Sequence, residues 1–193
     1  MLPPDSADPI DALRSATREH HERVDRLMDV QRMRDPAHYT RILQVLHAFL
    51  AGWEPRVAAA LPARTPWLQA RSRRPFLEQD LRGMGVAVPP AADVPALADA
   101  AAAWGSIYVM EGSALGGQVI SRVLAGTGSE SAASYFRGWG EATGRMWREV
   151  RQLLATELAT PAATARACDA ARQTFDTLAH LLEGPLNERT PAA

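Results

Sequence analysis

The 193-residue sequence contains little cysteine and no excess of either charge. Cys168 is the single cysteine, which excludes a disulfide within the chain and a metal site built from several thiolates. The net charge of -1 at pH 7 argues against a dedicated nucleic-acid-binding protein. A single cysteine is typical of a reducing compartment, so we expect a cytoplasmic protein.

The sequence also lacks a long apolar run and a leader-like beginning. Its longest apolar run, residues 100–110, is far short of the roughly 20 residues that a membrane-spanning helix needs. The opening "MLPPDSADPIDALRS" has prolines and acids where a signal peptide needs basic and then apolar residues. We therefore expect no membrane segment and no targeting segment.

Convincing stretches of alternating apolar and polar residues, the pattern of a half-buried strand, are absent as well. Apolar residues follow a helical period almost everywhere, and they make up 47% of the chain, enough for one substantial core. The sequence thus predicts a single all-α domain over residues 1–193, with frayed ends at residues 1–8 and 186–193.

The expected helical segments are bounded by prolines, glycines and candidate caps. Pro55 is expected to kink or break the second segment, and Asp93 is the candidate N-cap of the fourth. Loops are expected at 61–67 and 86–95. The six segments begin near residues 8 or 9, 36, 68, 94, 132 and 162. The third, from residue 68, is either one helix or two short ones and ends at Gly83 or Gly85.

The fourth segment carries the stretch "YVMEGSALGGQVI" and poses a question, because each glycine inside a helix costs about 0.5–1 kcal/mol relative to alanine. Gly105, Gly112 and Gly116 are spaced by seven and four residues and share one helix face, with Gly117 beside them. A face without side chains suits a closely packed second helix. It also suits a flat ligand lying against the backbone, and the spacing leaves both interpretations open.

The first segment carries "TREHHERVD", in which the helical period distinguishes two histidines. His21 falls on the narrow face that holds Ile10, Thr17 and the apolar residues after it, whereas His20 is about 100° away. Asp25 lies one turn after His21 and is its natural hydrogen-bond partner. His21 is therefore the better candidate for a ligand, although a structural histidine at the core edge fits the same pattern.

Taken together, "LRSATREHHERVD" and "YVMEGSALGGQVI" resemble the haem oxygenase family, most closely its bacterial, biliverdin-producing members, including those associated with bacteriophytochromes. The resemblance implies an all-α, multi-helix fold with haem held between a proximal and a distal helix. In that family a threonine precedes the iron-ligating histidine by four residues, as Thr17 precedes His21. The resemblance thus implies that His21 ligates the iron and that Asp25 accepts a hydrogen bond from its other ring nitrogen. The distal haem contacts implied are Tyr108, Gly112, Gly116 and Gly117.

The resemblance also assigns the catalytic side and the propionates. Gly112, Ser113 and Gly116 fall where the family activates oxygen. The animal enzymes have an aspartate directly after the first distal glycine, and Ser113 stands there instead, which cannot act as a carboxylate. The implied partners of the haem propionates are Arg14 and, on a later helix, Arg145 and Arg148, since arginine suits carboxylates.

The activity implied is the oxidative cleavage of haem b (iron protoporphyrin IX), both cofactor and substrate, with O2 to biliverdin, carbon monoxide and ferrous iron. Electrons would come from an external ferredoxin or flavin reductase, because no flavin or nicotinamide motif is present. The resemblance also implies a bacteriophytochrome as the recipient of the biliverdin. Two alternatives stay open: a non-catalytic haem carrier or sensor on the same fold, which Ser113 would suit, and a haem-free helical protein whose glycines are a packing seam.

Overall fold

The computed structural model describes residues 8–126 and 132–184, and in these ranges it contains helices and no strand, as the sequence predicts. The expected frayed ends lie outside the described residues except for Asp8, which is the N-cap of the first helix. No helix in the described ranges is both long and apolar enough to cross a membrane. The elements are α1 (Pro9–Met28), η1 (Val30–Arg34), α2 (Pro36–Ala60), η2 (Pro62–Arg64), α3 (Thr65–Gln69), α4 (Arg74–Gly83), α5 (Ala100–Leu124), α6 (Ser134–Arg137), α7 (Ala142–Glu157) and α8 (Pro161–Glu183).

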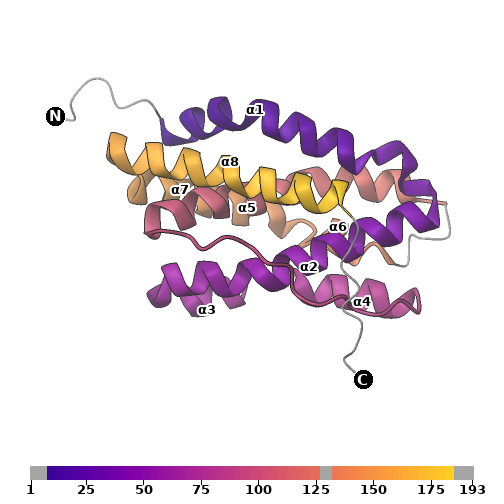
Figure 1. The fold of residues 1–193 in the computed structure, drawn as a ribbon. Helices are drawn as coiled ribbons and strands as arrows, with labels where there is room; N and C mark the ends of the chain where they lie inside the picture. The colour runs from indigo at the N-terminus through magenta and orange to yellow at the C-terminus, as the bar shows by residue number, and fades with distance from the viewer. Residues whose placement is uncertain (1–7, 127–131, 185–193) are drawn as a thin grey trace.

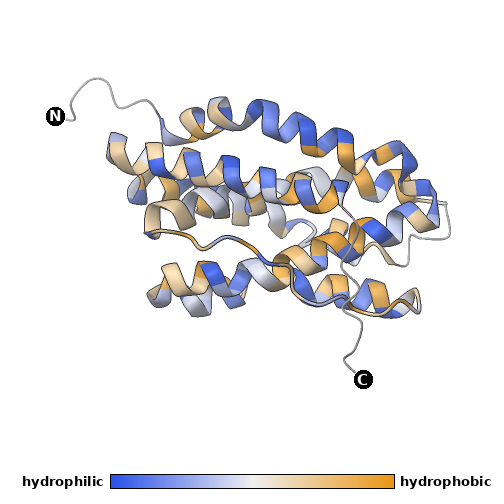
Figure 2. Cartoon of the chain, viewed as in Figure 1, coloured by the Kyte–Doolittle hydropathy of each residue, from blue (hydrophilic) through white to orange (hydrophobic). Residues whose placement is uncertain are grey.

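The last helix, α8, organises the molecule because it packs along both α1 and α5 (Figure 1). The helices α2 and α4 pack against each other on the opposite side of the molecule. Hydrophilic residues mark the outer face of α1 in Figure 2, and apolar residues turn inward. The core centres on fully buried side chains from several helices, among them Leu13, Tyr39, Phe49, Trp104 and Leu154.

Short side chains fix where the long helices begin. Asp8 Oδ1 accepts a hydrogen bond of 2.9 Å from the Ile10 amide, and Pro9 follows as the first helical residue. The same arrangement starts α2 with Asp35 and Pro36, and α8 with Thr160 and Pro161. The prediction of the first, second and last helix starts is confirmed.

The predicted N-cap of the glycine-bearing helix is wrong, because Asp99 and not Asp93 caps α5. Asp99 Oδ1 accepts from the Ala102 amide at 2.8 Å, whereas the Asp93 side chain is fully exposed. The connector before α5 is held extended on α2, where the Ala92 amide donates to the Ala48 carbonyl at 2.8 Å. A side chain at Gly52 would meet the Ala92 carbonyl oxygen at 2.2 Å, so this glycine allows the close approach.

Two further expectations need correction. Of the kink or break expected at Pro55, the break is wrong: α2 continues through this residue, because the buried side chains of Trp53 and Val57 anchor both sides of the proline in the core. The expected loop at 61–67 instead contains η2 and the start of α3. The segment around residue 68 does split into two short helices, and the second ends at Gly83 as predicted.

The segment from residue 132 is interrupted at Gly138 and Gly140, whose φ angles of +52° and +56° favour glycine and separate α6 from α7. The short helix α6 is fixed by Asp80, a buried carboxylate on α4. It accepts hydrogen bonds of 2.9 Å from the amides of Ser134 and Tyr135. This clamp sets the position of α6 against α5.

Candidate functional site

A cavity of about 780 Å3 lies between α1 and α5, and residues of α8 border it. Ligand sites in proteins are usually about 300–1,000 Å3 and mostly apolar. This cavity fits both criteria, because most of the side chains around it are aliphatic or aromatic. Its apolar lining includes Ile10, Val24 and Met28 from α1, Val109, Leu115, Val119 and Ile120 from α5, and Phe175, Leu178 and Leu182 from α8.

His21 borders this cavity from the α1 side. Its Nδ1 lies 3.1 Å from Asp25 Oδ2, one turn later on the same helix, and its ring meets the Phe175 ring edge-on at 5.6 Å. The hydrogen bond that His21 donates to the Asp25 carboxylate raises the pKa of His21. Because Asp25 occupies Nδ1, Nε2 is the nitrogen that can bind a metal, which is the usual arrangement for a ligating histidine. Thr17, also on the cavity wall, is buried and donates to the Leu13 carbonyl at 2.8 Å.

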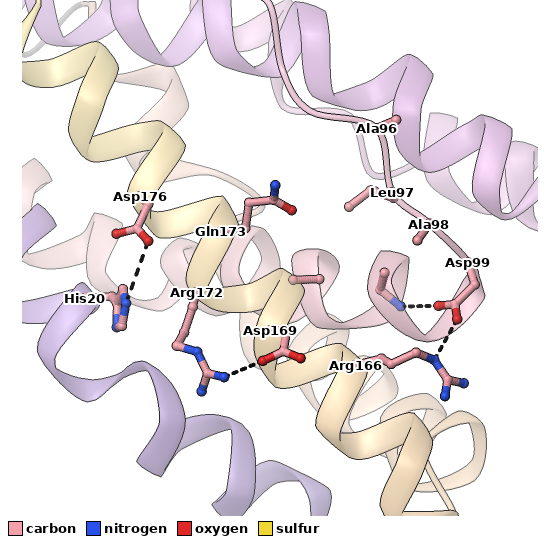
Figure 3. A pocket seen from close by; sticks show the side chains of 12 residues that line it. His20, Ala96, Leu97, Ala98, Asp99, Arg166, Asp169, Arg172, Gln173 and Asp176 are labelled. Carbon is pink, nitrogen blue, oxygen red and sulfur yellow. Dashed lines mark hydrogen bonds and ion pairs between the residues drawn. The ribbon is translucent and has the colours of Figure 1, made fainter.

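His20 turns away from the cavity and lies in a separate surface groove (Figure 3). Its Nε2 is 3.8 Å from Asp176 Oδ2 on α8. The arginines that line this groove are themselves paired: Arg172 with Asp169, and Arg166 Nε with Asp99 Oδ2 at 2.6 Å. Of the two neighbouring histidines, the structure brings His21 to the cavity, as the helical period indicates.

The glycines of α5 divide into two kinds. A Cβ atom at Gly105 would lie 2.0 Å from the Ala167 carbonyl oxygen on α8, and one at Gly117 would lie 2.3 Å from the Phe136 carbonyl oxygen on α6. A Cβ at Gly116 would meet nothing within 4 Å, and one at Gly112 would reach the Trp147 ring at an ordinary contact distance of 3.5 Å. Gly105 therefore serves close packing, while Gly112 and Gly116 leave room at the cavity.

Gly117 combines the two roles. It is buried and borders the cavity, but its missing side chain is required by the backbone of α6. Tyr108, nine residues earlier on the same helix, also borders the cavity, and its ring lies 5.8 Å from that of Trp147. Burial raises the pKa of the Tyr108 hydroxyl. Close packing therefore accounts for Gly105 and Gly117, whereas Gly112 and Gly116 leave the open face that a flat ligand would need.

Ser113 is held in a hydrogen-bonded arrangement that the sequence does not reveal. Its Oγ donates to the Met110 carbonyl at 2.7 Å and accepts from Arg73 Nη2 at 2.9 Å. Arg73 is the residue just before α4, and it is only 7% exposed. In the row of arginines "ARSRRP", the burial of Arg71 and Arg73 gives no signal in the sequence.

The basic residues around the cavity differ in part from the predicted set. Arg14 borders the cavity and forms an exposed ion pair of 2.9 Å with Asp11. Arg145 and Arg148 are exposed on α7, and neither lines the cavity. Arg151, one turn further along α7, does line the cavity. Arg145, Arg148 and Arg151 follow one another at intervals of three residues, so the sequence alone was enough to add Arg151 to the candidate propionate partners. Arg18 is a further basic residue on the lining.

A family model described as "Heme oxygenase" matches residues 8–184, which is most of the chain. The chain belongs to the haem oxygenase family. It is 38% identical over 141 residues to a haem oxygenase of Xanthomonas campestris pv. campestris (strain 8004), an alignment that covers 71% of this chain and 84% of that protein. This haem oxygenase homologue is accordingly an enzyme that degrades haem, and the carrier and haem-free alternatives are not favoured.

The fold agrees with a solved structure of the same family. The NO- and CO-bound haem oxygenase from Neisseria meningitidis superimposes with a TM-score of 0.76, covering 95% of this chain and 98% of that one, at 22% identity. At this identity the likeness establishes the all-α fold of the haem oxygenase family.

The residues around the cavity fit a haem. His21 offers a nitrogen on one wall, and the open position at Gly116 lies on the opposite helix. Apolar side chains border the space between them, and arginines such as Arg14 and Arg151 border it with positive charge. A flat apolar ring with two carboxylates needs these features.

Proposed function

We propose that this enzyme cleaves haem b with O2 and external electrons to biliverdin, carbon monoxide and ferrous iron, with His21 as the proximal ligand. The observation that carries the proposal is the His21–Asp25 pair on α1 bordering the same cavity as the bare backbone of Gly116 on α5. When bound, haem supplies the iron on which oxygen is activated and the ring that is opened.

The residues of the chain bind and orient the substrate. Asp25 accepts a hydrogen bond from the Nδ1–H group of His21, which fixes the tautomer and leaves Nε2 for the iron. Gly112 and Gly116 leave space for the ring and for oxygen on the opposite side, and Gly117 lets α6 close against α5. The hydroxyl of Ser113 donates its hydrogen bond to the Met110 carbonyl, so in this position its hydrogen is not directed at a ligand in the cavity.

The partners in the proposal are an external electron donor, either a ferredoxin or a flavin reductase, and a bacteriophytochrome that receives the biliverdin. The single cysteine, Cys168, suits a reducing compartment, so we place the enzyme in the cytoplasm. Cys168 is buried, and burial raises the pKa of its thiol, so it is a poor nucleophile.

Turnover of bound haem is the direct test. The purified protein is mixed with one equivalent of hemin, and a ferredoxin with its reductase and NADPH is added under air in the presence of catalase. We expect the Soret band to disappear, bilin absorption to replace it, and biliverdin to be identified by chromatography. A stable ferrous-haem spectrum without bilin would instead indicate a carrier.

The arginines around the cavity are predicted to hold the haem propionates, with Arg14 and at least one of Arg145 and Arg148 in contact. Each exposed charge pair contributes about 0.2–1 kcal/mol, so the combined Arg14→Ala, Arg145→Ala and Arg148→Ala changes should weaken haem binding by about tenfold. The ring would also rotate more freely, so the ratio of biliverdin isomers should change.

The matched comparison is the pair Arg18→Ala and Arg151→Ala, which removes two arginines that the structure places on the cavity lining. Haem affinity and the isomer ratio are measured for both sets. If the second set alone changes the isomer ratio, the propionates lie against Arg18 and Arg151 and the predicted set is wrong.

A further inference from the structure

Arg73 lies in the wall between the haem cavity and a second cavity. The second cavity has a volume of about 420 Å3 and lies between α2, α3 and α5. Arg73 and Met110 border both cavities. Arg73 is only 7% exposed, which shields its positive charge from bulk water. It contacts Ser113, so this charge lies on the side of the haem cavity that residues 112–117 of α5 form. We call this side the distal wall.

Arg73 differs from the arginines next to it in having no counter-ion. Arg71 Nη2 lies 2.5 Å from Glu111 Oε2, and Arg74 Nε lies 3.6 Å from Glu54 Oε2. Within residues 8–126 and 132–184, Arg73 forms no ion pair. Burial of an unpaired charge is unfavourable, so a residue needed only for packing would be better uncharged here.

The guanidinium is held by groups that fix its position without neutralising it. Arg73 Nη2 donates to the Met110 carbonyl at 2.5 Å and to Ser113 Oγ at 2.9 Å, and Cζ lies 4.7 Å from the centre of the Tyr135 ring. Both bonds use one nitrogen, and Nε and Nη1 make no hydrogen bond to any residue that the structure describes. A carbonyl, a hydroxyl and an aromatic face orient a cation but leave its full charge in place.

We propose that Arg73 is a specificity-determining residue that makes the distal wall prefer anionic over neutral ligands of the haem iron. The ligand class is a small anion, with azide as the probe. This inference rests on the proposed position of haem between α1 and α5. A fixed unit charge several ångströms away in a partly shielded site changes the affinity for an anion by about tenfold or more, and it has little effect on a neutral ligand.

The test compares azide with imidazole, which is neutral at pH 8, as ligands of the ferric haem complex, each titrated by absorption spectroscopy. Arg73→Met should weaken azide binding by about tenfold and leave imidazole binding largely unchanged. Arg73→Lys, which keeps the charge, should retain most of the azide affinity. Arg73→Gln serves if the methionine variant does not fold, because its amide can still donate to Met110 and Ser113.

The matched control is Arg71→Met, two residues earlier, which removes a buried arginine that is already paired with Glu111 and Glu149. It should lower the melting temperature but keep the ratio of azide to imidazole affinity. Equal changes in both affinities for Arg73→Met and Arg73→Gln would overturn the role of Arg73. If the unaltered protein showed no histidine-ligated haem spectrum at all, the proposed function would fail first, and this inference with it.

Discussion

The Gly116→Leu substitution is expected to weaken haem binding by roughly tenfold to a hundredfold and to leave the apoprotein as stable as before. A side chain at this position would point into open space in the haem-free protein, since a Cβ there meets nothing within 4 Å. Leucine is also a better helix former than glycine by about 0.5–1 kcal/mol. With haem present the same side chain has to share the cavity, and forcing extra methylene groups into a filled site costs about 1–3 kcal/mol.

Gly105→Ala is the matched control on the same helix, and the opposite result is expected. Even one methyl group there would lie 2.0 Å from the Ala167 carbonyl oxygen, so α5 and α8 would have to separate. We expect a loss of about 2 kcal/mol or more in unfolding free energy, which lowers the melting temperature by about 4–8 °C in a chain of this size.

The two measurements are the melting temperature of the apoprotein and the haem dissociation constant from Soret titration. Gly116→Leu should change mainly the second, and Gly105→Ala mainly the first. If Gly116→Leu lowered the apoprotein melting temperature as much as Gly105→Ala and left haem affinity unchanged, Gly116 would belong to a packing seam and the cavity would not be the haem site.

This contrast shows what a helical period can and cannot predict. Spacing places Gly105 and Gly116 correctly on one face of α5, but they lie along different parts of that face. Which part is covered depends on where α8 crosses α5. The position of α8 on α5 is determined by tertiary packing, which the spacing within α5 does not reveal. The sequence therefore predicts the bare face, and the structure divides it into a packed part and an open part.

The His21 side of the cavity was more predictable, because it depends on residues within one helix. The pairing of His21 with Asp25 follows from an i, i+4 spacing, and the separation of His20 from His21 follows from about 100° per residue. Long-range features could not be predicted in this way. The burial of Arg73 and the choice of Asp99 over Asp93 as a cap both depend on how distant segments pack.

The continuation of α2 through Pro55 illustrates the same limit. A proline inside a helix removes one hydrogen bond and costs about 3 kcal/mol, so a break is the reasonable local prediction. Burial of Trp53 and Val57 on either side outweighs that cost, because fully burying a large apolar side chain contributes about 1.5–3 kcal/mol each. A local rule was overridden by packing.

Removal of the His21 imidazole is the second large effect expected. His21→Ala should abolish the histidine-ligated haem spectrum, because His21 is the histidine that the structure places on the cavity wall. His20→Ala should leave the spectrum largely intact, since His20 lies in the other groove beside Asp176. Loss of the spectrum in His20→Ala alone would show that the ligand is assigned to the wrong histidine.

Asp25 gives this assignment a pH dependence. Asp25 raises the pKa of His21 in the haem-free protein. The contact between the Asp25 carboxylate and the protonated His21 ring therefore stabilises the fold fully below about pH 6.5, and this stabilisation is lost as the pH rises through the raised pKa. The iron binds only the neutral ring, so haem affinity should fall by about one decade per pH unit below that pKa.

In Asp25→Asn the pKa of His21 loses the largest contribution that raises it, and only the more weakly acting Glu22 carboxylate remains, so the fall in affinity should begin at a lower pH. Soret titrations of both proteins between pH 5 and about pH 8.5, a range that spans the ordinary histidine pKa, give the two midpoints. The affinity of Asp25→Asn at high pH should itself be about 10–100-fold lower, because the partner that orients the ring is weakened. A common midpoint for both proteins would mean that Asp25 does not act through the proton on His21, and that the 3.1 Å contact only holds the ring in place.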